Sequence, residues 1–111
     1  MHEVKGYWQN YIDGAWVDGG AGRIDVINPG TGEKIAEQAL ADARDVDLAV
    51  QAAKRVHSTG VLTDMRPVER GRIVQAMGRY LLEHLEEIAA LLSLEQGKPI
   101  WEARIEVTGA A

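Results

Sequence analysis

Histidine and cysteine supply many of the metal ligands and catalytic groups in proteins. The chain contains no cysteine, which excludes a disulfide, a thiolate metal site and a catalytic thiol within these residues. Its histidines, His2, His57 and His84, do not have the spacing of metal ligands. The residues after His84 do not complete the H-E-x-x-H pattern that places two imidazoles on one helical face. We therefore interpret the histidines as ordinary surface or helix-end residues.

The glycine-rich stretch Gly30-Thr31-Gly32 is the one segment that resembles a phosphate-binding loop. It continues with Glu33 and Lys34, so it completes neither G-x-G-x-x-G nor the P-loop pattern, and the acid would repel a phosphate. We interpret it as a turn. Ser58 and Ser93 lack a neighbouring base and the strained elbow of a nucleophile. The acids are numerous, but acids on helix faces are usually solvated, so the sequence predicts no catalytic and no cofactor-binding residue.

Composition narrows the class of protein. The 111 residues are 46% hydrophobic and 26% charged, which is typical of a globular chain. The net charge of −5 argues against nucleic acid as a partner, because binding phosphates needs a basic surface. The sequence shows no signal region and no apolar run near the roughly 18 residues that span a bilayer. We expect a cytoplasmic protein with no membrane partner.

Residues 1–41 have the pattern of strands and turns. Asp13-Gly14 lies between two short apolar runs and predicts a β-hairpin, because glycine tolerates the positive φ of a type I′ turn. Two further extended segments are predicted at residues 23–28 and 34–40, the first of them rich in β-branched side chains.

Residues 42–111 have helical periodicity. One helix is predicted to begin at Asp42 and to end at residues 58–60. A second tract opens near Pro67 and stops at Gly97, and its spacing permits one continuous helix. A third tract starts at Pro99 and shows no stop signal before the last residue. We therefore expect the chain to be truncated within its last helix.

Five stretches resemble, in order and in spacing, the N-terminal portion of the NAD(P)-dependent aldehyde dehydrogenases. They are Tyr11 to Val17, similar to an "I-x-G-x-W" hairpin; Val26 to Glu33, similar to "V-x-N-P-x-T-G-E"; Asp45 to Ala53; Glu69-Arg70; and Leu94 to Pro99, similar to "E-T-G-K-P". Gln96 departs from the usual threonine. The resemblance covers the chain from about Tyr11 to Ala111.

The resemblance implies an α/β fold, in which short strands and a hairpin precede amphipathic helices of a Rossmann-like cofactor domain. It also implies an aldehyde substrate, NAD or NADP as cofactor, a cysteine nucleophile, a glutamate base and a homo-oligomer. In the family the nucleophile, the base and the dinucleotide-binding loop all lie beyond the matching position of residue 111. We therefore expect an N-terminal fragment of a dehydrogenase that binds no cofactor by itself. The alternative is a stand-alone interaction module derived from the family.

The resemblance further implies two sites. Some family members bind K⁺ or Na⁺ at positions that match Val26, Ile27 and Glu95, where main-chain carbonyls and one carboxylate would supply oxygen ligands. The competing interpretation is that Glu95 caps its helix or pairs with Lys98. The family's substrate tunnel is lined by the helix after "G-K-P", which places Ile105 and Gly109 on its wall.

Apolar faces without a partner are also expected, because the family's helices pack on a sheet of the cofactor domain. We expect the stripe formed by Leu81, Leu85, Ile88 and Leu92 to be left uncovered and to favour self-association.

Overall fold

The computed structural model describes residues 6–111, which divide into two compact units. The first, called the sheet unit, comprises residues 6–26 and 34–65. The second, called the helical unit, comprises residues 27–33 and 66–111. Strands are followed by helices along the chain, so the predicted α/β class is confirmed.

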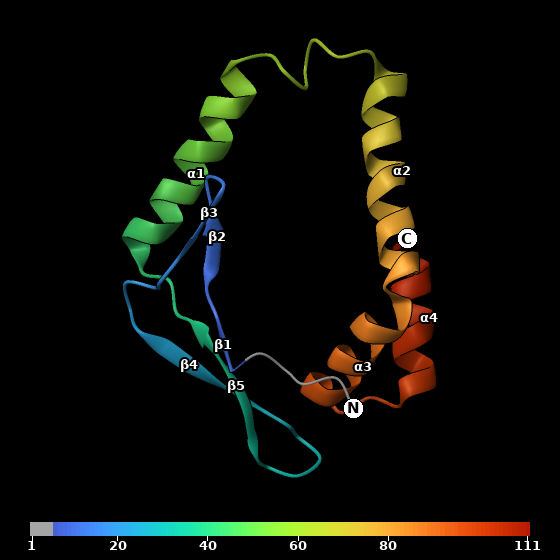
Figure 1. Cartoon of the computed structure of the whole chain (residues 1–111). Coiled ribbons are helices and arrows are strands. Elements are labelled where there is room, and N and C mark those ends of the chain that lie inside the picture. Colours follow the sequence, from blue (N-terminus) through green and yellow to red (C-terminus); the bar gives the residue numbers. More distant parts are fainter. Residues whose placement is uncertain (1–5) are drawn as a thin grey trace. The chain divides into compact units, whose positions relative to one another are not determined.

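The sheet unit contains five short strands and one helix, although the last residue of the fourth strand, Ile27, belongs to the helical unit (Figure 1). They are β1 (Tyr7–Trp8), β2 (Asn10–Ile12), β3 (Ala15–Val17), β4 (Arg23–Ile27), β5 (Lys34–Ala39) and α1 (Ala43–Ser58). Three strands form a sheet in the order β1-β5-β4, in which β1 runs parallel to β5 and Tyr7 lies opposite Glu37. The strands β2 and β3 form a separate antiparallel pair.

The predicted hairpin is confirmed between β2 and β3. Asp13 and Gly14 have φ angles of 53° and 80°, as the two central residues of a type I′ turn require. The register places Tyr11 opposite Trp16, and the centroids of their rings are 4.9 Å apart. This aromatic pair stabilises a ribbon that has only three residues in each strand.

The helix α1 begins after Asp42, as predicted, and two aspartates fix its start. The Asp42 carboxylate accepts hydrogen bonds from the backbone N–H groups of Arg44 and Asp45, and the Asp45 carboxylate accepts one from the N–H of Asp42. Asp45 also accepts a bond of 2.7 Å from the N–H of Gly20, which ties the glycine-rich connection to the helix. A Cβ at Gly20 would come within 2.2 Å of Asp42 Oδ2, so a side chain at this position would displace the capping carboxylate.

The helical unit contains α2 (Pro67–Glu83), α3 (Leu85–Gln96) and α4 (Ile100–Ala110). The continuous helix that periodicity permits is not formed, because the helix breaks at His84, which has φ −107° and ψ 18°. Apolar residues continue on both sides of this break, so the spacing alone does not reveal it. The predicted stop at Gly97 is confirmed by its φ of 74°.

The core of the helical unit lies between α3 and α4. Ala89 and Ala103 are fully buried and Val107 is nearly so. Leu81, Leu85, Ile88 and Leu92 pack against these residues and are half-buried, so the prediction that this stripe is uncovered is wrong. Helix α4 contributes Ala103 and Val107 to the cluster against which the stripe packs. Among the exposed apolar side chains of α2, Val74, Met77 and Tyr80 are the most exposed.

Candidate functional site

The glycine-rich stretch at residues 30–32 is confirmed as a turn, and its backbone N–H groups are hydrogen-bonded within the turn. The N–H of Gly30 donates to Asn28 Oδ1 at 2.9 Å, and the N–H of Gly32 donates to the Asn28 carbonyl at 2.8 Å. Because the amides that would cradle a phosphate are already bonded within the turn, these residues do not fit a dinucleotide.

The predicted cation residues lie in β4 and in the last turn of α3. Val26 is half-buried in β4, and Ile27 ends that strand with 44% of its surface exposed. Within the helical unit the loop after Ile27 lies beside the end of α3, because a Cβ on Gly97 would come within 2.7 Å of Pro29 Cγ. Glu95 is exposed two residues before Gly97. The structure thus brings the loop that follows Ile27 close to the helix end that carries Glu95.

The alternative pairing of Glu95 with Lys98 is not formed. The Lys98 ammonium instead lies 2.5 Å from a carboxylate oxygen of Glu106. No cluster of three or more histidines or acids that could hold a metal ion occurs in residues 6–111. A site made of main-chain carbonyls and one carboxylate is of a different kind and stays a prediction.

The predicted tunnel residues share one face of α4. Ile105 is 63% exposed, and the space around Gly109 is open, with no heavy atom within 4 Å of a Cβ built there. Trp101, four residues before Ile105, is 61% exposed and extends the same face. Trp101 was not predicted to belong to this face, although its spacing of four residues from Ile105 indicates it. This exposed surface is called the outer face of α4 below.

An apolar groove lies between the hairpin and α1 in the sheet unit. Its volume is about 520 Å³, and its lining is mostly apolar: Tyr11, Ile12, Ala49, Ala52, Ala53, Val56 and Leu62. Asp13 at the turn is paired with Arg55, which is on α1, and His57 completes the wall. The groove holds no arrangement of a nucleophile with a base.

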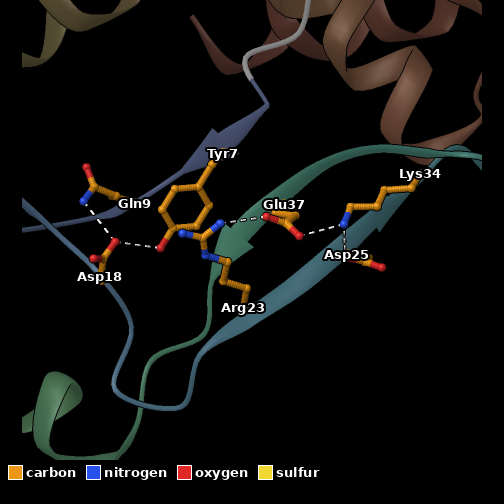
Figure 2. A network of polar contacts seen from close by, with 7 residues as sticks. All are labelled: Tyr7, Gln9, Asp18, Arg23, Asp25, Lys34 and Glu37. Atoms are coloured by element: carbon orange, nitrogen blue, oxygen red, sulfur yellow. Dashed lines mark hydrogen bonds and ion pairs between the residues drawn. The ribbon is translucent and has the colours of Figure 1, made fainter.

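A network of polar side chains connects the three-stranded sheet, and sequence reasoning missed it (Figure 2). The Arg23 guanidinium lies 3.8 Å from the centre of the Tyr7 ring and 3.0 Å from a Glu37 oxygen. The other Glu37 oxygen lies 2.7 Å from the Lys34 ammonium, which also pairs with Asp25. The network crosses β1, β5 and β4, whose lateral order the sequence does not disclose.

The network shifts the pKa values of its members. Lys34 and then Arg23 lower the pKa of the Glu37 carboxyl by bonding to its charged form. Hydrogen bonds from Gln9 and Tyr7 lower the pKa of Asp18. Loss of solvent contact and the bond to Asp18 raise the pKa of the Tyr7 hydroxyl. The polar groups of these side chains bond to one another across the strands, so we assign them a structural role.

Comparison with known proteins identifies the family. Residues 16–111 match the model of the aldehyde dehydrogenase family. The chain is 42% identical over 101 residues to N-succinylglutamate 5-semialdehyde dehydrogenase of Burkholderia thailandensis, and 41% identical over 102 residues to malonate-semialdehyde dehydrogenase 1 of Oceanobacillus iheyensis. Each alignment covers 91% of this chain, and 20% and 21% of the respective relatives.

Solved structures agree with this result. The NAD-dependent aldehyde dehydrogenase of Sinorhizobium meliloti matches 96% of this chain with a TM-score of 0.87 and 37% identity, over 22% of its own length. Betaine aldehyde dehydrogenase of Staphylococcus aureus, solved with NAD⁺, matches 89% of this chain with a TM-score of 0.85 and 31% identity, over 20% of its length. The chain belongs to the aldehyde dehydrogenase family and spans about a fifth of the length of these relatives.

The ion pairs of Glu37 predict a pH dependence of stability. Because the pKa of Glu37 is lowered in the folded state, its contribution is present above the pKa of the unfolded chain and is lost as the pH falls through the folded value. The free energy of unfolding should decrease from about pH 5 to about pH 3, and less so in Glu37→Gln. Urea unfolding at each pH measures this. Glu33→Gln, a side chain outside the network, is the control, and equal slopes in the wild type and Glu37→Gln would contradict the assignment.

Proposed function

We propose that this chain forms the N-terminal portion of an NAD(P)-dependent aldehyde dehydrogenase, which oxidises an aldehyde to a carboxylic acid. The observation that carries the proposal is the match of 96% of the chain, at a TM-score of 0.87, to an NAD-dependent member of the family. Relatives named for semialdehydes and for betaine aldehyde support an aldehyde as the substrate class. A cytoplasmic location and a homo-oligomeric state are part of the same proposal.

In this proposal the chain contributes structure, and the chemistry comes from the rest of the enzyme. The family's reaction needs a cysteine nucleophile, and this sequence contains none. NAD(P) supplies the hydride acceptor when it is bound, but the turn at residues 30–32 uses its own amides internally and does not fit the cofactor. The role left for these residues is to position α4 and the strands around the site.

A second candidate, a stand-alone interaction module, is favoured by one observation. Val74, Met77 and Tyr80 on α2 each expose about three fifths of their surface or more. Exposed apolar side chains at helical spacing are typical of a surface that packs against another polypeptide. An enzyme would cover this face with its own later residues, whereas a module would cover it with a separate protein.

The first prediction from this proposal concerns activity. A hybrid enzyme, in which residues 1–111 replace the matching part of the Sinorhizobium meliloti dehydrogenase, should oxidise aldehydes with NAD or NADP. The isolated 111-residue chain should show no such activity, because it lacks a thiol nucleophile. Cofactor reduction measured by absorbance tests both. A folded but inactive hybrid enzyme would contradict the proposed function, and aldehyde oxidation by the pure chain would contradict the assigned division of roles.

The second prediction tests Ile105 and Gly109 as part of the aldehyde path. Gly109→Met in the hybrid enzyme should lower kcat/KM for bulky aldehydes by roughly tenfold more than for small ones, because the longer side chain narrows the passage. Gly71→Met is a matched control, since Gly71 is an exposed helical glycine that also has open space around it. Equal losses for bulky and small aldehydes would contradict the assignment.

The third prediction tests the cation site at Val26, Ile27 and Glu95. Added K⁺ should raise the melting temperature of the hybrid enzyme, because a ligand that binds only the folded state stabilises it. Glu95→Ala should reduce this response by removing the carboxylate ligand. Glu102→Ala removes an exposed acid of α4 and serves as the control. A response to K⁺ that is unchanged in Glu95→Ala would place the site elsewhere.

A further inference from the structure

The buried centre of the contact between α3 and α4 is made of small side chains. It consists of Ala89 on α3 and of Ala103 and Val107 on α4, and larger half-buried side chains, among them Leu85 and Ile88 of α3, pack against it. Helices lock together when the ridges of one fit the grooves of the other, and alanine forms a shallow ridge. The small centre permits close approach, and contacts on the two flanks of α4 add to the restriction of its rotation.

Two ion pairs lie on opposite sides of this core. A helix turns by about 100° per residue, so Arg104, one residue after Ala103, lies on one flank of the buried stripe. Glu106, one residue before Val107, lies on the other flank. Arg104 makes a two-pronged contact with Glu86 on α3, at 3.0 Å and 2.7 Å. Glu106 pairs with Lys98 in the connection between α3 and α4.

The Lys98 end of the second pair is itself held in place. Only 17% of the Lys98 side chain is exposed, and its main-chain carbonyl accepts a hydrogen bond of 2.6 Å from the hydroxyl of Ser93 on α3. The backbone of the residue that binds Glu106 is therefore bonded to α3, and its side chain is largely covered. The Arg104 pair is more exposed, but its guanidinium meets both oxygens of one carboxylate, which fixes direction as well as distance.

We propose that Lys98–Glu106 and Arg104–Glu86 act together as positioning residues that set the rotation of α4 and hence the orientation of its outer face. Ile105 lies two residues from both Ala103 and Val107, about 200° around the helix, so it points away from the core. Any roll of α4 displaces Ile105 and Gly109 sideways. If the chain has the proposed function, the rotation of α4 affects the aldehyde path. The two ion pairs then help to determine which aldehydes pass the outer face of α4.

The first experiment measures selectivity in the hybrid enzyme. Lys98→Met and Arg104→Met each remove the ion pair on one flank of α4, and the two flanks are opposite. Each substitution therefore changes the ratio of kcat/KM for a bulky aldehyde to that for a small one by about threefold or more. The two changes have opposite directions. Lys98→Arg keeps the charge and retains the wild-type ratio. Lys34→Met, the same exchange at ion pairs outside α3 and α4, leaves the ratio unchanged. Unchanged ratios in both variants, or shifts in the same sense, overturn the proposal.

The second experiment detects a change in the rotation of α4 without an activity measurement. Val107 is 5% exposed, and this chain has no cysteine of its own, so Val107→Cys reports on the core face of α4. Labelling of that residue by a thiol reagent, followed by peptide mass spectrometry, is about threefold faster with Lys98→Met and unchanged with Lys98→Arg or Lys34→Met. Equal labelling rates in all backgrounds overturn the proposal. An inactive hybrid enzyme that shows the labelling pattern contradicts the proposed function alone.

Discussion

Close approach of backbones through small side chains is the constraint on which this structure depends. In residues 6–111 the buried hydrophobic residues are Ala36, Ala39, Ala89, Ala103 and Val107. Gly78 follows the same rule, since a Cβ there would come within 2.3 Å of the carbonyl oxygen of Ala111. A core of this kind brings elements close together but contributes little apolar area by itself, so half-buried side chains such as Leu85 and polar contacts add to the orientation of the elements.

Polar contacts supply that orientation in each unit. In the sheet unit Asp45 binds the N–H of Gly20 and so connects the start of α1 to the glycine-rich segment, while the network around Glu37 connects three strands. In the helical unit two ion pairs flank the alanine contact of α3 and α4. Exposed ion pairs add little to stability, and the role proposed for these two pairs concerns the orientation of α4.

The large apolar side chains complete this division of roles. Trp101 and Ile105 on α4, and Val74 and Met77 on α2, are exposed while alanines are buried. In a family whose members are about five times longer, such faces are suited to contact later parts of the polypeptide. Under the proposed function, the segment contributes prepositioned surfaces to an enzyme, and the reactive groups come from the rest of that enzyme.

Local signals in the sequence determined the elements. The hairpin at Asp13-Gly14, the cap at Asp42 and the stop at Gly97 were all predicted, because each depends on the backbone preference or hydrogen bonding of a few adjacent residues. The absence of a catalytic thiol also followed directly from the sequence.

Only the tertiary structure decided the break at His84, the partner of Lys98 and the network around Glu37. Each of these depends on which segments lie side by side. Helical periodicity is the same on both sides of a break, and the charge of a lysine does not select Glu106 over the nearer Glu95. Sequence spacing predicts neighbours within an element, whereas contacts between elements follow from how closely their backbones can approach.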